Sequence, residues 1–265
     1  MSERERVVEV EHLVTHYGIR RILNDVSLAV LKGEIMVIMG GSGSGKSTLL
    51  RHMVGLELPT SGRVRVFGRD MAHLSREEAL ELRRRMGVAF QSGALFSSMT
   101  VGQNIMLPLA ELAELDPTTM EIMMRMKLEL VDLAGFEDLM PSELSGGMTK
   151  RAAMARSIIM DPKILFCDEP SAGLDPAVSS ALDELILKLR DALHMTIVVV
   201  THELESAFKI ADRITVLDHG EVLSVDVPEA IRNSPNEQIQ NLIQRRPEVE
   251  AVDPNEYLKR LTGEA

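Results

Sequence analysis

Apolar residues recur along the chain with two different periods. Alternating apolar positions in Val7–Val10 and Val26–Val30 predict two half-buried strands on either side of a turn at Gly18. Short, mainly apolar runs at Glu34–Met39 and Thr196–Val200 have the length of strands, and a segment of helical periodicity follows each. Strands that alternate with helices in this way predict a mostly parallel sheet with helices on both faces.

The same criteria locate the remaining elements. Further strands are predicted at Arg63–Phe67, Met86–Phe90, Lys163–Cys167, Ile214–Leu217 and Glu221–Val225. Helices are predicted at Lys46–Val54, Ser75 to about Arg84, Pro176–Leu193 and Glu203–Ile210. Ser75 and Glu78 have the spacing of a capping box, which fixes the start of one of these helices.

The segment from Val101 to Met160 has a different character, because it is helical throughout and poor in β-branched residues. Two β/α blocks therefore bracket an all-helical insert, which we expect to span about residues 97–160. One of its helices carries four methionines: Met120, Met123, Met124 and Met126. Their adaptable side chains suit either an internal helix core or a groove for a partner, and the sequence leaves both open.

Composition limits the class of protein. The 265 residues suit one large domain or a domain with an inserted lobe, and the formal net charge of −11 disfavours nucleic acid and anionic lipid surfaces as partners. One cysteine, Cys167, excludes an internal disulfide and fits a reducing compartment. We expect no secretory signal and no membrane span, since no apolar run approaches the ~20 residues that cross a bilayer. Action at a membrane would therefore require a partner.

The first chemical signal is the segment Gly40-x-x-x-x-Gly45-Lys46-Ser47, between a predicted strand and a predicted helix. Glycines let the backbone curl so that successive N–H groups point at phosphate oxygens, and the helix N-terminus adds its dipole. Lys46 offers a positive charge to the β- and γ-phosphates, and Ser47 offers a hydroxyl to Mg²⁺. The pattern predicts a P-loop.

Two adjacent carboxylates follow the apolar run Ile164–Cys167. Asp168 and Glu169 would lie at the carboxyl end of a parallel strand, where ligands bind in such sheets. Asp168 is the candidate for holding Mg²⁺, and Glu169 is the candidate for polarising the attacking water. Acidic residues often end strands, so the pair is informative mainly because a P-loop accompanies it.

A second candidate phosphate site lies at Leu144-Ser145-Gly146-Gly147-Met148, which opens a helix predicted to reach about Met160. A serine hydroxyl and two glycine amides at a helix N-terminus form a phosphate-binding end. The alternative is an ordinary serine N-cap. One chain needs only one such site for a γ-phosphate, whereas two chains arranged head to tail about a two-fold axis would each close the other's site.

In this order the motifs resemble those of the ATP-binding subunits of ABC transporters, over about residues 7–231. The resemblance implies an α/β fold: a P-loop NTPase core with a mostly parallel sheet, an antiparallel N-terminal β-subdomain and an inserted α-helical subdomain. It assigns residues 1–244 to the ATPase domain. It assigns residues 245–265 to a tail that clasps a second copy or a partner, the alternative being a frayed end. It also implies ATP hydrolysis to ADP and phosphate, coupled to transport, with ATP and Mg²⁺ as cofactors.

The resemblance implies a role for each motif residue. Nucleotide contacts are expected from Tyr17, Gly40, Gly41, Ser42, Gly43, Ser44, Gly45, Lys46, Ser47, Thr48, Ser145, Gly146 and Gly147. Mg²⁺ ligands are expected at Ser47, Gln91 and Asp168, and catalytic roles at Lys46, Gln91, Glu169 and His202. Tyr17 would stack on adenine, although it could also be a plain surface aromatic, and Ser171–Asp175 would cross the dimer interface.

Met148 occupies a position where glutamine is commonest in the superfamily, and this difference narrows the resemblance to one subfamily. Together with Gln91–Phe96 and Ala207–Arg213, the segment is similar to the MlaF-like ATPases of Mla phospholipid transporters in Gram-negative envelopes, relatives of Mce-type lipid importers. The substrate rests on this resemblance alone, because the residues themselves carry no sign of lipid. The implied location is cytoplasmic, peripheral on the cytoplasmic face of the inner membrane.

The resemblance also implies partners. They are a second copy of the chain, which forms a dimer around ATP, and an integral membrane permease. A small regulatory cytoplasmic subunit and an Mce-domain lipid-binding protein are further candidates, and nucleic acid is not expected. The segment Gly93–Met99 and the helical lobe would lie where the permease makes contact.

Other functions compete with phospholipid transport. A transporter of another substrate is the nearest alternative. A soluble ABC ATPase acting on ribosomes or DNA commonly has two cassettes or a long coiled-coil insertion, whereas this chain has one cassette and a short insert. A non-catalytic regulatory cassette usually lacks the catalytic glutamate or the switch histidine, and Glu169 and His202 are both present.

Overall fold

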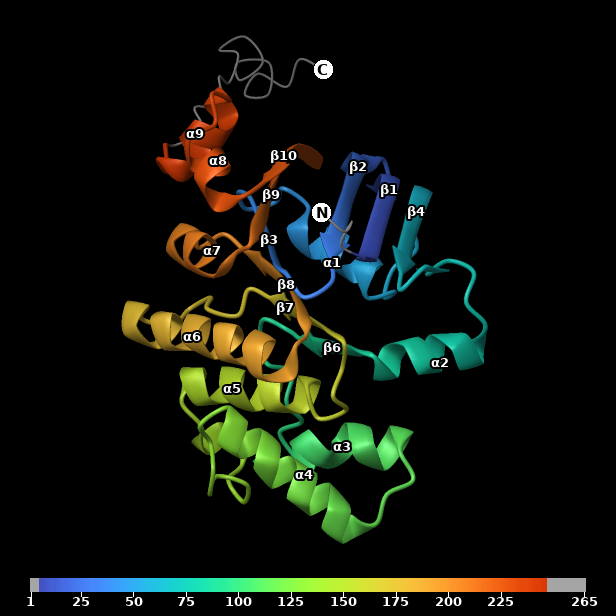
Figure 1. The fold of residues 1–265 in the computed structure, drawn as a ribbon, viewed down its shortest axis with the longest axis vertical. Helices are drawn as coiled ribbons and strands as arrows, with labels where there is room; N and C mark the ends of the chain where they lie inside the picture. Colours follow the sequence, from blue (N-terminus) through green and yellow to red (C-terminus); the bar gives the residue numbers. More distant parts are fainter. Residues whose placement is uncertain (1–4, 247–265) are drawn as a thin grey trace, which may run out of the picture.

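Two β-sheets form the upper part of the molecule in the computed structural model, which describes residues 5–246 (Figure 1). The four-stranded sheet has the order β2-β1-β4-β5, with bounds β1 (Arg6–Tyr17), β2 (Arg20–Leu31), β4 (Ser61–Val66) and β5 (Arg69–Asp70). The six-stranded sheet has the order β10-β9-β3-β8-β7-β6, with bounds β3 (Ile35–Met39), β6 (Met86–Ala89), β7 (Ile164–Asp168), β8 (Thr196–Thr201), β9 (Arg213–Asp218) and β10 (Glu221–Asp226).

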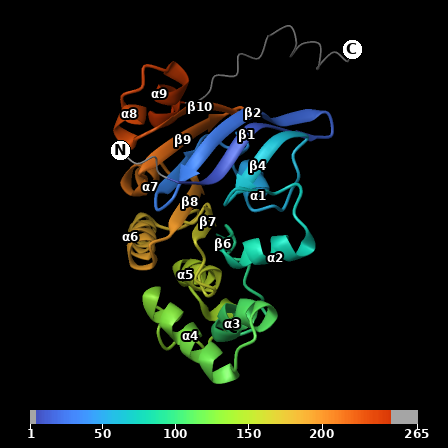
Figure 2. The ribbon, with the colours of Figure 1, turned by 45° about the vertical axis from the view of Figure 1, so that its right-hand side comes forward.

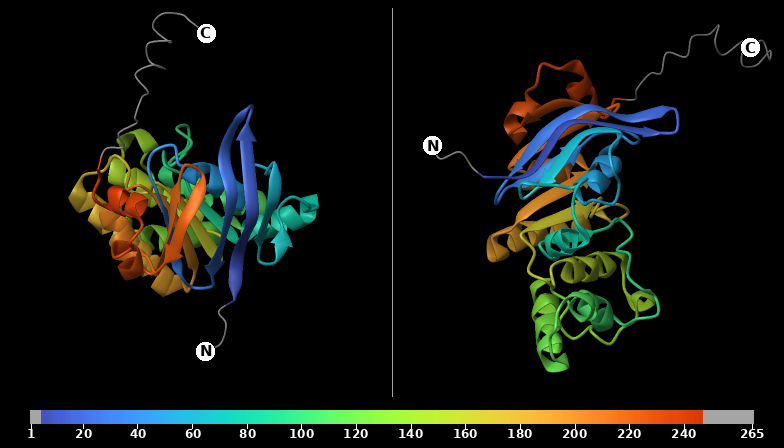
Figure 3. Two further views of the ribbon diagram at one scale, coloured as in Figure 1. Left: turned by 90° about the horizontal axis from the view of Figure 1, so that it is seen from above. Right: turned by 90° about the vertical axis from the view of Figure 1, so that its right-hand side faces the viewer.

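Strand direction separates the two sheets. The first pairs antiparallel throughout. In the second, β6, β7, β8, β3 and β9 are parallel, and only the β9–β10 hairpin is antiparallel. The expected fold, a mostly parallel sheet plus an antiparallel N-terminal subdomain, is confirmed. Figure 3 shows β1 and β2 running beside the β9–β10 hairpin, where the backbone N–H of Asn24 donates to the carbonyl of Gly220.

The helices fall into two groups. Those that cover the sheets are α1 (Lys46–Met53), α2 (Arg76–Arg84), α6 (Pro176–Leu193), α7 (Leu204–Ile210), α8 (Pro228–Arg232) and α9 (Glu237–Ile243). The helical layer consists of α3 (Val101–Leu112), α4 (Pro117–Leu130), the short 3₁₀ turn Pro141–Glu143 and α5 (Gly146–Ser157). Figures 1 and 2 show α3 and α4 at the end farthest from β1 and β2, with α5 between them and the sheet.

The central strand β3 shows why the sheet is covered on both sides. All five of its residues, Ile35–Met39, are buried. Ile35, Val37 and Met39 belong to a core shared with the helical layer, α6 and α7. Met36 and Ile38 point the other way, into a core shared with α1 and the four-stranded sheet. Two hydrophobic cores therefore hold β3, and its carboxyl end is a rigid place for a site.

The structure corrects several expected boundaries. β1 and β2 have 12 residues each and extend beyond the predicted strands. The prediction was too short because register shifts in their pairing interrupt the apolar alternation on which it was based. Helix α5 ends at Ser157 rather than near Met160. α8 and α9 were not predicted, since elements of 5 and 7 residues are too short to show a helical period.

The methionines of α4 lie on both sides of that helix. Met124 is buried, and Met120 and Met123 pack against the main core. Met126, by contrast, is 64% exposed. The core interpretation thus holds for three of the four methionines. Among the described helices, none has the length and apolar character that crossing a membrane requires. The tail prediction concerns residues 245–265, of which 247–265 lie outside the described range.

Candidate active site

The segment between β3 and α1 has the backbone shape that the glycine pattern predicts. Gly45, the N-cap of α1, has a φ of 101°, and a Cβ there would lie 2.7 Å from Cδ2 of Leu23, so only glycine fits. No side chain caps α1, and its first N–H groups are therefore left for a ligand. The buried Lys46 donates from Nζ to the carbonyl oxygens of Gly40 (2.9 Å) and Gly41 (2.7 Å).

Asp168 and Ser47 meet at the carboxyl end of β7. The Ser47 hydroxyl donates to Oδ1 of Asp168 at 3.2 Å, although the two residues are far apart in sequence. Burial raises the pKa of Asp168, the hydrogen bond from Ser47 opposes this, and the neighbouring Glu169 charge adds to it. Burial also lowers the pKa of Lys46, against the attraction of Glu169 and Asp168. A P-loop cation therefore shares one desolvated space with two carboxylates.

Glu169 and His202 form a pair at the same edge of the sheet. β7 and β8 are neighbours in register, Asp168 opposite Val200, so the residues that follow them come together. Nδ1 of His202 lies 2.9 Å from Oε2 of the buried Glu169. Glu169 has a φ of 47°, rare for a residue with a side chain, and its N–H donates to the carbonyl of Val200 at 2.8 Å.

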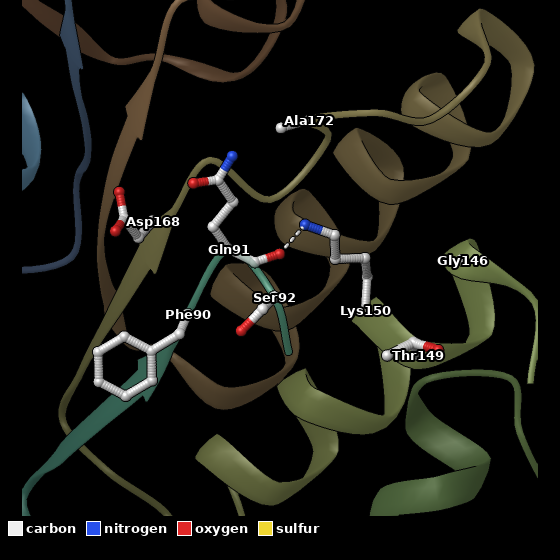
Figure 4. A pocket seen from close by; sticks show the side chains of 8 residues that line it. All are labelled: Phe90, Gln91, Ser92, Gly146, Thr149, Lys150, Asp168 and Ala172. Atoms are coloured by element: carbon white, nitrogen blue, oxygen red, sulfur yellow. Dashed lines mark hydrogen bonds between the residues drawn. The ribbon is translucent and has the colours of Figure 1, made fainter. Parts of the chain in front are cut away.

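Gln91 follows β6 and lines a cleft of about 580 Å³. Its walls are Phe90, Gln91, Ser92, Gly146, Thr149, Lys150, Asp168 and Ala172 (Figure 4). Figure 4 shows the side-chain amide of Gln91 extending toward the loop that carries Ala172, while its backbone carbonyl accepts a hydrogen bond from Lys150. The cleft thus connects the end of β6, the end of β7 and α5.

The N-terminus of α5 is a second open helix end. Ser145 is its N-cap, and its hydroxyl accepts from the N–H of Met148 at 3.3 Å. Ser145 and Gly146 are exposed. A Cβ on Gly147 would lie 2.6 Å from Cγ1 of Val178, so the helix needs glycine here to pack against α6. The P-loop contributes no residue to the cleft that Gly146 lines.

Two further predicted residues, Tyr17 and Ser171, make no hydrogen bond to these groups. Tyr17 is 45% exposed at the end of β1, and its hydroxyl donates to Oε2 of Glu57 at 2.6 Å. Ser171 is buried, and its hydroxyl has no hydrogen-bond partner among the described residues. The structure brings Lys46, Ser47, Asp168, Glu169 and His202 to one sheet edge.

Sequence reasoning missed Lys150, which bonds the backbone of the site from α5. The available signal was two successive cations, Lys150 and Arg151, in the second turn of a helix with no acid in its first turn. Cations near a helix N-terminus gain nothing from the helix dipole, which indicates that their partners lie elsewhere in the fold.

Comparison with protein families shows to which family the chain belongs. The model of the ABC transporter family matches residues 23–172, which include the P-loop, the start of α5 and both carboxylates. The chain belongs to the ABC transporter family. It is an ATP-binding and ATP-hydrolysing subunit, an ABC ATPase.

Relatives of this ABC ATPase carry the names of transport subunits. It is 40% identical over 87% of both chains to the intermembrane phospholipid transport system ATP-binding protein MlaF of Haemophilus influenzae. The corresponding protein of Escherichia coli K12 is 39% identical over 85% of this chain and 84% of its own length. The probable ribonucleotide transport ATP-binding protein mkl of Mycobacterium tuberculosis H37Rv is 40% identical over 79% of this chain, which covers 58% of that relative.

Solved structures agree with this family. A dimeric, post-hydrolysis ATP-binding cassette, MJ0796 with bound ADP and Pi, has a TM-score of 0.77 and 30% identity, covering 83% of this chain and 98% of its own. CbiO1 of Clostridium perfringens, part of the ABC transporter complex CbiONQ, has a TM-score of 0.80 and 27% identity, covering 97% of this chain and 100% of its own. The homologous cassettes therefore occur as dimers and as parts of transporter complexes.

Proposed function

We propose that this ABC ATPase powers phospholipid transport between membranes, from the cytoplasmic face of an inner membrane and through a permease partner. The observation that carries the proposal is the breadth of the match to two proteins named MlaF, which extends over 84–87% of their lengths. The mkl protein has equal identity, but this chain covers only 58% of it. Its name makes ribonucleotide the main competing substrate.

Within the site, we propose that the phosphates lie on Gly40–Thr48 and that Lys46 turns from the carbonyls of Gly40 and Gly41 toward them. This is supported by the uncapped N–H groups at the start of α1 and by the two weak acceptors that hold Lys46, which a phosphate would outcompete. Tyr17 would lie against the base, held by its bond to Glu57.

The residues present also fit Mg²⁺. Ser47 and Asp168 offer a hydroxyl and a carboxylate oxygen 3.2 Å apart, with Gln91 across the cleft, an all-oxygen set of the kind Mg²⁺ prefers. In the described part of the chain no group of three or more His, Cys, Asp or Glu is placed to hold a metal ion, so phosphates and water would have to complete the ligands. Bound Mg²⁺ would neutralise charge on the β- and γ-phosphates.

Glu169 is proposed to orient the attacking water, and His202 to contact the γ-phosphate. The pair supports this because Nδ1 of His202 fixes one oxygen of the Glu169 carboxylate, leaving the other for water. Lys46 would stabilise charge on the departing phosphoryl group.

A second copy would supply Ser145–Gly147 to the same γ-phosphate. The exposed N-terminus of α5 supports this, since it offers N–H groups and lines a cleft to which the P-loop contributes no residue. ATP would bridge the two copies, and loss of the γ-phosphate would release them. The helical layer would pass this motion to the permease.

The function is tested with the chain co-expressed with the proteins encoded beside its gene and purified from detergent-solubilised membranes. We expect an integral membrane protein to co-purify, and ATP to drive transfer of a fluorescent phospholipid between vesicles. The same complex carrying Glu169→Gln is the matched control and should transfer none. ATP-driven uptake of a labelled ribonucleotide without lipid transfer would refute the proposal. Co-purification with ribosomes or DNA and no membrane protein would favour the soluble class.

A further inference from the structure

We propose that Lys150 is a positioning residue for ATP hydrolysis: from α5 it holds the backbone carbonyls of Gln91 and Glu169 and so sets where their side chains stand. The inference rests on the roles proposed above for Gln91 and Glu169. It adds a residue that acts through the backbone of two residues of the proposed site.

The geometry places one ammonium group between three elements. Nζ of Lys150 donates to the carbonyl of Gln91, which follows β6, and to the carbonyl of Glu169 at 3.3 Å, which follows β7. α5 itself belongs to the helical layer. Figure 4 shows the Lys150 side chain reaching the backbone carbonyl of Gln91. The side-chain amide of Gln91 points away from this hydrogen bond. A shift of α5 relative to the sheet would therefore move both carbonyls.

The backbone of Glu169 gives an independent reason for such a contact. A φ of 47° costs a residue with a side chain about 1 kcal/mol or more, and it persists only where neighbours hold it. The carbonyl of Glu169 accepts its hydrogen bonds outside the sheet ladder. The N–H of Ala172 donates to it at 3.2 Å, and Lys150 is the charged donor on the same oxygen.

A second cation on α5, Arg156, also hydrogen-bonds the loop that follows β6. Arg156 donates to the carbonyls of Gly93 at 2.9 Å and Ala94 at 2.7 Å. The same loop packs closely on α5, since a Cβ on Gly93 would lie 3.1 Å from Cγ2 of Thr149. Arg156 anchors the loop, whereas Lys150 alone among these contacts joins it to Glu169.

The test compares Lys150→Met, Lys150→Arg and, as a matched control, Lys163→Met in the full-length protein. Lys163 is exposed at the opposite end of β7. We expect Lys150→Met to lower kcat about tenfold while the Kd for a fluorescent ATP analogue changes less than about twofold. Lys150→Arg should recover most of the rate because it keeps a cationic donor, and Lys163→Met should match the wild type.

A double-mutant cycle with Gln91→Ala separates positioning from mere stability. If Lys150 acts through Gln91, Lys150→Met should cost clearly less in the Gln91→Ala background than in the wild type. An unchanged kcat for Lys150→Met would overturn the proposal. Strictly additive losses of kcat in the double mutant would also overturn it. So would a loss of kcat that is accompanied by a lower melting temperature and that Lys150→Arg does not recover. If Gln91→Ala and Glu169→Gln themselves hydrolyse ATP normally, the proposed site is wrong whatever Lys150 does.

Discussion

The N-termini of α1 and α5 are the two helix ends at which we propose that phosphate binds. At α1 the cap is the left-handed Gly45 with no side-chain bond, followed at once by Lys46 and by Ser47 beside Asp168. At α5 the cap is Ser145, with two glycines and no charged residue in the first turn. The α1 end therefore brings a cation and candidate metal ligands, whereas the α5 end brings only the dipole and a hydroxyl.

The two ends also differ in what holds them. The α1 end follows β3, whose side chains lie in two cores. The α5 end belongs to the helical layer, and Lys150 in its second turn joins it to the backbone of Gln91 and Glu169. We infer that α1 determines whether one chain binds nucleotide, and that α5 determines whether two chains close on it. The following predictions test that division.

The largest effect is expected on ATP hydrolysis, the step that follows closure of both helix ends on ATP. Glu169→Gln should lower phosphate release by roughly a thousandfold, since an amide cannot accept a proton from water, while ATP binding and ATP-dependent dimerisation persist. Phosphate release and light scattering after size-exclusion chromatography measure the two. The exposed Glu205→Gln is the control and should behave as wild type. Hydrolysis near the wild-type rate would remove Glu169 from this role.

Lys46→Ala tests the α1 end alone. Loss of the cation should weaken ATP binding by a single chain roughly 10- to 100-fold, because the phosphates lose a charge-assisted hydrogen bond. Titration with a fluorescent ATP analogue at low protein concentration measures it, and the exposed Lys163→Ala serves as control. An unchanged Kd would contradict the P-loop assignment.

Ser145→Ala tests the α5 end, best in the Glu169→Gln background where ATP is not consumed. ATP affinity of the single chain should stay within about twofold, while the dimer weakens about tenfold. The alanine also removes a helix cap worth ~1 kcal/mol. Ser75→Ala is the control, since the Ser75 hydroxyl likewise accepts from the N–H three residues on at the start of α2, where Glu78 also bonds back to the N–H of Ser75. It should cost similar stability and leave the dimer intact; equal dimer loss in both variants would make the effect one of folding.

The sequence predicted the residues at the α1 end better than the contacts of α5, for a physical reason. Lys46, Glu169 and His202 follow short apolar strands and Asp168 ends one, and parallel strands bring their carboxyl ends to one edge. Lys150 bonds a backbone carbonyl 59 residues away in sequence. Backbone carbonyls carry no sequence signature, so that contact follows only from how α5 packs. The limits of the helical insert and the role of the tail stay predictions.

The smallest effect concerns the base, at the far end of the nucleotide held by α1. Tyr17→Phe removes the hydroxyl with its interactions with Glu57 and Arg51 but keeps the ring, so ATP affinity should change less than about twofold. Tyr17→Leu removes the ring and should cost about fivefold, the order expected for one stacking contact. Both are measured by the fluorescent-nucleotide titration, with the exposed Ile19→Ala as control. If Tyr17→Leu binds ATP as tightly as the wild type, Tyr17 is a plain surface aromatic. The proposed phosphate contacts at the N-terminus of α1 would then account for ATP binding by a single chain without a contribution from Tyr17.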